Sequence, residues 1–184
     1  MNPVVRSLLI WKNKLFFRPE PFAFAKTLNE ARSILVLPPH QADSFSSVFN
    51  HLAPLESVFR NLKVFFLLPF GTQGFISTLK TCEIVLLDKE DIGWSGLPRR
   101  SFVQKLRICG FDVTLDLDLS KNFLNAYLGL LSQAKVRIGA KGRWGPPFYN
   151  LELTVPPDLL YLDEQYDCMI RTLRSVRMEK ILEA

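Results

Sequence analysis

Two side chains suited to acid–base chemistry lie in a short loop between an apolar run and a helical pattern. Residues 33–37 are almost entirely apolar, which is typical of a buried parallel strand, and Pro38-Pro-His-Gln-Ala-Asp43 follows them. In open α/β sheets, ligands bind outside the carboxyl ends of the strands. A base in this loop would therefore lie within reach of a bound hydroxyl group. We predict Asp43 as a catalytic base, and His40 as an acid, a base or a phosphate-binding group.

Both residues also have a structural interpretation. An aspartate immediately before Ser44 can cap a helix, because its carboxylate accepts hydrogen bonds from the backbone N–H groups of the first turn. A single histidine in a loop is commonly a surface residue without a chemical role. The sequence leaves both alternatives open, since they differ only in where the side chains point.

A second group of candidate residues is basic and lies within residues 137–143. It contains Arg137, Lys141 and Arg143. The planar guanidinium group matches the geometry of phosphate and forms paired hydrogen bonds with it. We predict that these three residues bind an anionic ligand; the alternative is a solvated basic loop. The net charge of +5 suits an anionic partner without identifying it.

Several other kinds of site find no support in the sequence. No Gly-X-Ser-X-Gly elbow marks a hydrolase, and Pro69-Phe-Gly-Thr-Gln-Gly74 fits neither the dinucleotide-binding nor the P-loop pattern. Cys82, Cys109 and Cys168 have no metal-ligand spacing, so we expect core thiols. The aromatic residues occupy core positions and do not alternate with basic ones. We therefore predict no nucleic-acid binding.

The order of apolar and amphipathic segments predicts the fold. Apolar runs predict strands at residues 33–37, 62–68, 83–88, 111–118 and 135–139. Helical patterns lie between and around them, including a short one that ends at Leu79 and a clear one from residue 162 to 176. Strands that alternate with helices over short connections predict a doubly wound parallel sheet, which is a Rossmann-like α/β fold. With 184 residues, of which 48% are hydrophobic, we predict a single domain.

The N-terminal segment is a basic amphipathic helix by its pattern. We assign residues 1–21 to this segment and residues 22–184 to the Rossmann-like domain. Apolar residues recur at helical spacing in residues 3–17, and four basic residues lie between or just after them: Arg6, Lys12, Lys14 and Arg18. Such a helix can lie on an anionic membrane surface. The alternative is that its apolar side packs on the domain or on a second subunit.

Two longer stretches carry a resemblance to a known family. Leu106-Arg-Ile-Cys-Gly-Phe-Asp-Val-Thr-Leu-Asp116 and Ala134-Lys-Val-Arg-Ile-Gly139 are similar to passages in the N-terminal domain of the heptosyltransferases, which are glycosyltransferases of bacterial lipopolysaccharide assembly. Asp43 falls where that family has the aspartate that deprotonates the acceptor. Here Ala42 replaces the family's glycine, and the loop is one residue shorter. The resemblance extends over nearly the whole chain.

The resemblance implies one half of a glycosyltransferase of the GT-B architecture. In that architecture two Rossmann-like domains face each other across a cleft; the N-terminal domain holds the acceptor, and the C-terminal domain binds the nucleotide-sugar. It implies Asp43 as the base and no metal. Together with the residue chemistry above, we predict that His40, Arg137, Lys141 and Arg143 bind the acceptor, and we predict no cofactor. The 184 residues end after the helix that leads to the second domain in the family. We therefore expect the chain to lack the nucleotide-sugar-binding half and to be inactive alone.

Two functions from different classes follow. In the first, the chain is the acceptor-side part of an enzyme of envelope polysaccharide assembly, completed by a separate nucleotide-sugar-binding domain. In the second, it is a non-catalytic binding or self-association module, such as a homodimer, that kept the fold. The substitution at Ala42 and the shorter loop favour the second. In either case we expect a cytoplasmic location, with peripheral contact to the inner membrane left open.

The pair Asp116 and Asp118 is similar to the Asp-X-Asp metal motif of another glycosyltransferase architecture, but the match covers three residues and the sheet context differs. We therefore predict no metal site here. Strand alternation places Asp112, Asp116 and Asp118 on one side of the predicted strand. Because a buried and unpaired carboxylate is costly, we expect these groups to lie at the exposed end of the strand or to bind neighbouring N–H groups.

Overall fold

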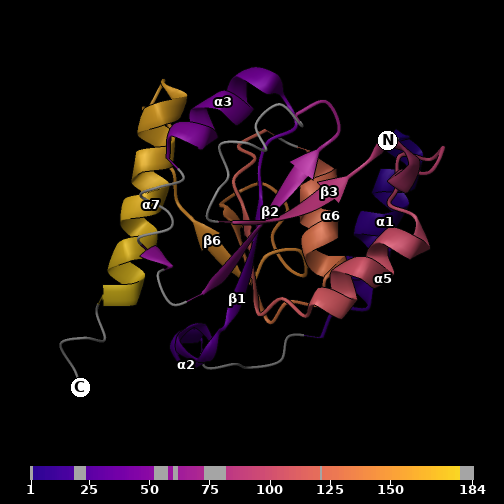
Figure 1. The fold of residues 1–184 in the computed structure, drawn as a ribbon, viewed down its shortest axis with the longest axis horizontal. Helices are drawn as coiled ribbons and strands as arrows, with labels where there is room; N and C mark the ends of the chain where they lie inside the picture. The colour runs from indigo at the N-terminus through magenta and orange to yellow at the C-terminus, as the bar shows by residue number, and fades with distance from the viewer. Residues whose placement is uncertain are drawn as a thin grey trace.

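The protein is a single parallel sheet with helices on both faces, seen in a computed structural model that describes residues 2–18, 24–51, 58–59, 62–72, 82–120 and 122–178 (Figure 1). Neighbouring strands are parallel throughout, in the order β3-β2-β1-β4-β5-β6. The strands are β1 (Ser33–Leu37), β2 (Lys63–Pro69), β3 (Glu83–Leu87), β4 (Val113–Asp116), β5 (Val136–Ala140) and β6 (Leu151–Leu153). The predicted doubly wound, Rossmann-like fold is confirmed.

Six α-helices lie within the described residues. They are α1 (Pro3–Leu15), α2 (Phe24–Glu30), α3 (Ala42–Asn50), α5 (Arg100–Cys109), α6 (Phe123–Leu131) and α7 (Leu162–Met178). The bounds of α1 and α7 were predicted within a few residues, because their apolar stripes recur at helical spacing, and the other helices lie where helical patterns were expected between or around the strands. The predicted helix that ends at Leu79 lies outside the described residues. Within the described part of the chain, no helix is long and apolar enough to cross a membrane.

Alternate side chains of the central strand point into two separate cores. Ile34 and Val36 face α3 and α7, whereas Leu35 and Leu37 face α5 and α6. Figure 1 shows these two helix pairs on opposite sides of the sheet. All five residues of β1 are buried, as expected for the centre of a parallel sheet.

Helix α1 lies outside these layers. Its Leu9 and Ile10 pack against a small third core that contains Phe123 of α6 and Phe148. The Asn2 carboxamide caps the helix by accepting a hydrogen bond from the Val4 N–H (2.9 Å), and the Asn2 N–H donates to the Ser95 carbonyl (3.3 Å). The N-terminal helix is therefore attached to both α6 and the loop that follows β3.

The amino ends of β1 and β4 are joined by the Asp112 carboxylate. Its Oδ2 accepts hydrogen bonds from the backbone N–H groups of Arg32 (2.8 Å) and Ser33 (3.2 Å). The Ser33 hydroxyl adds two further hydrogen bonds: it accepts one from the Asp112 N–H and donates one to the Gly110 carbonyl. This carboxylate thus binds neighbouring N–H groups, as the sequence predicted.

Three local predictions need correction. β6 was not predicted, because three residues are too short to show an apolar period. The glycine and acidic residues at positions 89–98 predict a loop-like linker, but the structure has a short 3₁₀ helix there, Lys89–Asp91, and a bridge between Ile92 and Pro98. The cysteines are not all core thiols: Cys109 is exposed, and the other two are half-buried.

A close approach between a strand and an aromatic ring gives a stability prediction. A Cβ atom at Gly139 of β5 would lie 2.5 Å from Tyr149 Cζ and 2.6 Å from Cε1. Gly139→Ala would therefore displace the buried Tyr149 ring. We expect it to lower the free energy of unfolding by about 1–3 kcal/mol in urea denaturation, the usual cost of overpacking a core.

The matched control is Gly93→Ala. Its added Cβ would lie 3.5 Å from the Leu97 carbonyl oxygen, an ordinary contact. We expect this variant to stay within about 0.5 kcal/mol of the wild type. Equal stability of the two variants would show that the Gly139–Tyr149 contact is not tight.

Candidate functional site

The strand order reverses direction between β1 and β4, and this is where α/β proteins place their ligands. β1 ends at Leu37 and β4 at Asp116, which are register partners. The two chains leave the sheet on diverging paths: one enters the loop with His40, and the other continues to α6. The candidate site is built around these two strand ends.

The Asp116 carboxylate is the buried centre of the site. Its Oδ2 accepts a hydrogen bond from the Tyr149 hydroxyl (2.6 Å), and its Oδ1 accepts from the Asp118 N–H (2.8 Å) and from Asn125 Nδ2 (3.2 Å). The side chain is 3% exposed. A buried carboxylate that is fully hydrogen-bonded is tolerated, and this arrangement agrees with the expectation that these aspartates bind neighbouring N–H groups.

Asn125 of α6 links this carboxylate to the loop after β1. Its Nδ2 also donates to the Pro38 carbonyl (2.8 Å), and its Oδ1 lies 2.8 Å from His40 Nε2. Because Oδ1 can only accept, His40 Nε2 carries the proton, and Nδ1 of the neutral ring is left with a lone pair. The imidazole is therefore held in one tautomer by a fully buried side chain.

Burial shifts the pKa of both His40 and Asp116. It lowers the pKa of His40, against smaller opposite effects of the Asn125 hydrogen bond and the Asp118 carboxylate. It raises the pKa of Asp116 from 3.8 to about 7, although the hydrogen bond from Tyr149 opposes it. At neutral pH the imidazole is thus uncharged and can accept a proton, while Asp116 is only partly ionised.

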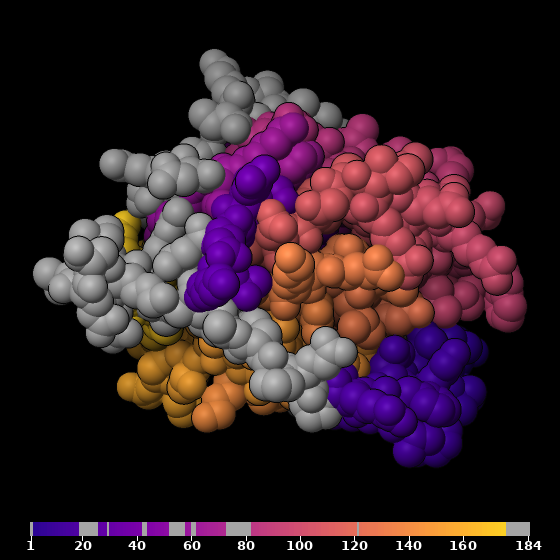
Figure 2. Space-filling view, turned by 90° about the horizontal axis from the view of Figure 1, so that it is seen from below, coloured from indigo at the N-terminus to yellow at the C-terminus, as the bar shows by residue number. Residues whose placement is uncertain are grey.

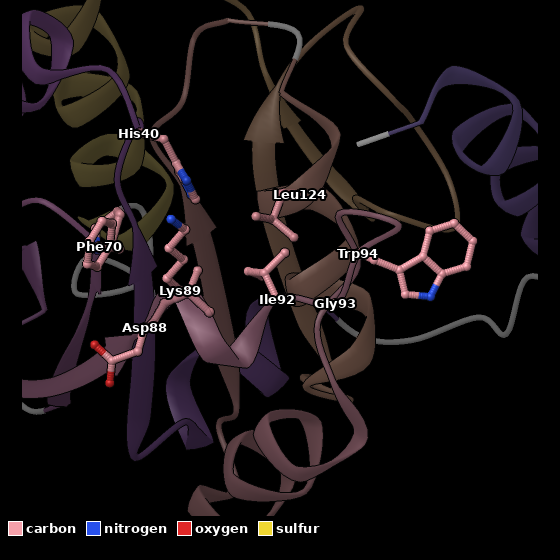
Figure 3. A pocket seen from close by; sticks show the side chains of 10 residues that line it. His40, Phe70, Asp88, Lys89, Ile92, Gly93, Trp94 and Leu124 are labelled. Atoms are coloured by element: carbon pink, nitrogen blue, oxygen red, sulfur yellow. The ribbon is translucent and has the colours of Figure 1, made fainter.

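A pocket of about 500 Å³ opens beside this network. Its polar wall includes His40 and Lys89, and its apolar wall includes Ile92 and Leu124, with Trp94 at its side. Figure 3 shows the Lys89 side chain rising toward the His40 ring, with Ile92 and Leu124 facing each other and the Asp88 carboxylate turned away. The volume lies in the range of small-molecule sites, and the two nitrogen-bearing side chains suit an anionic or hydroxyl-rich ligand.

The structure places Asp43 in the first turn of α3, just beyond the loop after β1. The cap position belongs to Gln41, so the alternative interpretation of Asp43 as the helix cap is wrong. The direction of its carboxylate lies outside what the structure describes. Its catalytic role stays a prediction.

Arg137 lies near the amino end of β5, away from the strand ends that form the pocket. Its Nε donates to the carbonyls of Pro147 (3.1 Å) and Phe148 (3.2 Å), and its Nη1 donates to that of Ala134 (2.7 Å). These bonds hold the segment that leads to Tyr149. Its predicted role in anion binding stays untested.

Lys141 and Arg143 follow β5 at the carboxyl edge of the sheet. Lys141 is exposed and Arg143 is half-buried. Neither side chain forms a hydrogen bond or an ion pair with the described residues, so both are available to a ligand there. They do not line the pocket beside His40. Of the four predicted acceptor-binding residues, the structure therefore places only His40 in the pocket.

Sequence reasoning missed Asn125, Tyr149 and Lys89. Asn125 carried a usable signal in the sequence, because it is the one amide in the otherwise apolar helix Phe123–Leu131. The structure buries it fully, and a buried amide needs hydrogen-bond partners. Lys89 lay in a stretch interpreted as a linker. Tyr149 could not be found by periodicity, because it reaches Asp116 from an irregular segment.

Comparison with known structures identifies proteins of similar fold. The ADP-heptose lps heptosyltransferase II of E. coli matches with a TM-score of 0.59 and 17% identity, over 75% of this chain and 40% of that chain. The E. coli heptosyltransferase WaaC with ADP matches with 0.59 and 14% identity, over 76% and 46%. The glycosyl transferase family 9 protein from Veillonella parvula DSM 2008 matches with 0.58 and 16% identity, over 80% and 42%.

No protein-family model and no curated protein matches the chain. At identities of 14% to 17% the structural matches concern the fold alone. They confirm the predicted resemblance to heptosyltransferases at that level. The chain spans 40% to 46% of the length of the three structures it matches.

The raised pKa of Asp116 predicts how stability depends on pH. The folded protein holds the Asp116 proton more tightly than the unfolded chain, so this group makes the free energy of unfolding fall between about pH 4 and pH 7. Asp116→Asn removes the titration and keeps an acceptor oxygen. We expect the stability difference between variant and wild type to move in favour of the variant by on the order of 2–4 kcal/mol from pH 4 to pH 8, measured by urea unfolding.

Two features make this measurement specific. The lowered pKa of His40 acts with the opposite sign, but His40 is present in both proteins, so its contribution is shared. The control is Asp158→Asn, at an exposed carboxylate, whose curve should run parallel to that of the wild type. An Asp116→Asn curve that is also parallel would contradict the raised pKa.

Proposed function

We propose that this chain is the acceptor-side domain of a glycosyltransferase that acts in envelope polysaccharide or lipopolysaccharide assembly. The observation that carries the proposal is the pocket beside His40 and Lys89, at the point where the strand order reverses. The likeness in fold to heptosyltransferases supports the same reaction class. A sugar acceptor needs a concave site with a few convergent polar groups, and this pocket offers one.

The chemistry of the pocket suits a phosphorylated sugar. Lys89 supplies a positive charge, and neutral His40 offers a lone pair that can accept a hydrogen bond from a hydroxyl group. The side chains of Ile92 and Leu124 form an apolar wall beside these two polar groups. In this proposal Lys141 and Arg143 keep their predicted place on the acceptor side and reach parts of a larger acceptor beyond the pocket. Arg137, at the amino end of β5, contributes by holding the segment that leads to Tyr149.

Asp43 is the proposed general base. Its position in the first turn of α3 follows the loop that carries His40, at the carboxyl end of β1. A base there would remove the proton of the acceptor hydroxyl as that oxygen attacks the anomeric carbon of the donor sugar, while the bond from that carbon to the nucleoside diphosphate breaks and the diphosphate leaves with the electron pair. The nucleotide-sugar would be held by a second domain or a separate partner chain, which faces this edge of the sheet.

The proposal predicts that the chain binds a phosphorylated lipopolysaccharide-core oligosaccharide. In calorimetric titration, Lys89→Ala and His40→Ala should each weaken binding by about tenfold or more, because each removes one of the two polar side chains that contact the ligand in this proposal. Nucleoside diphosphates should not bind the isolated chain, since their site would lie on the other half. Light scattering in the same buffer would give the mass of the binding species.

The control variant is Lys105→Ala, at an exposed lysine of α5 that does not line the pocket. It should bind like the wild type. Absence of oligosaccharide binding from a folded chain would contradict the proposal and favour the non-catalytic binding module. Binding that is weakened equally by Lys105→Ala would show a diffuse charge effect instead of a pocket.

A further inference from the structure

Helix α1 carries a second apolar surface that the protein itself does not cover. Leu9 and Ile10 face the body, but Val4, Leu8, Trp11 and Leu15 are 64%, 61%, 64% and 58% exposed. These four residues recur at helical spacing and form one stripe, called here the outer stripe. Figure 2 shows α1 as an indigo lobe at one edge of the molecule.

Basic side chains border the outer stripe on both sides. With about 3.6 residues per turn, Lys12 and Lys14 fall on opposite sides of the stripe, each roughly a quarter turn from its centre. Both are exposed. Residues 2–18 contain two further basic residues, Arg6 and Arg18, and no acidic residue. An apolar stripe between lysines, without any negative charge, is the pattern of helices that lie in the interface of an anionic bilayer.

The helix also lies beside other groups that suit a bilayer interface. The Asn2 N–H donates to the Ser95 carbonyl, so the loop with Trp94 lies at the start of α1, and Trp94 is 98% exposed. Tryptophan is enriched at membrane–water interfaces because its ring is amphipathic. A groove of about 350 Å³ between α5 and α6 is lined by Arg100, Arg107 and Tyr127. Tyr127 also packs against the small core under α1, so the groove and its two basic residues lie near this helix.

A second copy of the chain fits the outer stripe less well. Helix α1 carries basic side chains and no acidic ones, so two apposed copies would bring like charges together without an opposite charge to pair with them, which destabilises a contact. Four side chains on one helix also cover much less than the roughly 1,200 Å² buried in stable protein interfaces. Lipid headgroups carry the opposite charge, and the acyl region accepts apolar side chains of any arrangement.

We infer that α1 docks this protein on an anionic lipid bilayer. The outer stripe enters the boundary between headgroups and acyl chains, and Lys12 and Lys14 extend to the headgroup phosphates. The helix lies parallel to the membrane plane and does not cross it. This inference uses neither the pocket nor Asp43, so it can fail or hold independently of the proposed function.

Vesicle flotation tests the inference. The whole chain should float with vesicles of phosphatidylcholine and phosphatidylglycerol, and much less with phosphatidylcholine alone. Leu8→Ser/Trp11→Ser should weaken binding by about tenfold or more, because it removes the apolar part of the stripe. Lys12→Glu/Lys14→Glu should also weaken it by about tenfold or more, and added salt should weaken wild-type binding.

The matched control is Ile108→Ser, at an apolar residue of α5 that is 85% exposed and lies outside α1. It should float like the wild type. All substituted positions of α1 are exposed, so the variants should keep the wild-type melting temperature, which is checked by circular dichroism. The emission of Trp11, isolated as the difference between wild type and Trp11→Phe, should shift to shorter wavelength on anionic vesicles.

Three results would overturn the inference. The first is no flotation on anionic vesicles, and the second is flotation that Leu8→Ser/Trp11→Ser leaves unchanged. The third is a stable dimer in light scattering that the same double variant dissociates, which would identify a second copy as the occupant of the outer stripe.

Discussion

The structure of the site depends on the need to satisfy one buried carboxylate. Asp116 ends β4 in the middle of the sheet, where an unpaired charge would cost several kcal/mol. Three separate segments supply its donors: the chain just after β4, helix α6 through Asn125, and the segment after β5 through Tyr149. The carboxylate therefore fixes how these segments are arranged around the carboxyl ends of the strands.

The hydrogen bonds around Asp116 also determine where His40 lies in the pocket. Asn125 binds both Asp116 and the Pro38 carbonyl, and its remaining oxygen fixes the His40 ring. Tyr149 reaches Asp116 only because Gly139 leaves room for its ring. A rigid and internally bonded support of this kind is what places a functional side chain with the accuracy that binding needs. The position of His40 in the pocket therefore depends on the hydrogen bonds of the Asp116 carboxylate.

The sequence predicted the scaffold well and the site only in part. Apolar periodicity located β1, α1 and α7, because burial on one face leaves a repeating pattern. It also pointed to the loop of His40, since strand ends are common ligand sites. It could not reveal that Tyr149, 33 residues away from Asp116 in sequence, supplies its hydrogen bond, because such a contact depends on the tertiary path of an irregular segment. Lys89 was missed because only the tertiary fold brings its segment, which follows β3, to the same pocket as His40.

The two proposals meet in one segment of the chain. Trp94 lines the pocket, and the next residue, Ser95, accepts the hydrogen bond from Asn2 at the start of α1. Leu124 lines the same pocket from α6, the helix on which α1 packs. A helix that binds the bilayer would thus hold the pocket close to the lipid surface. An acceptor that carries acyl chains stays at that surface, so docking by α1 would raise its local concentration at the pocket without a new contact to the sugar.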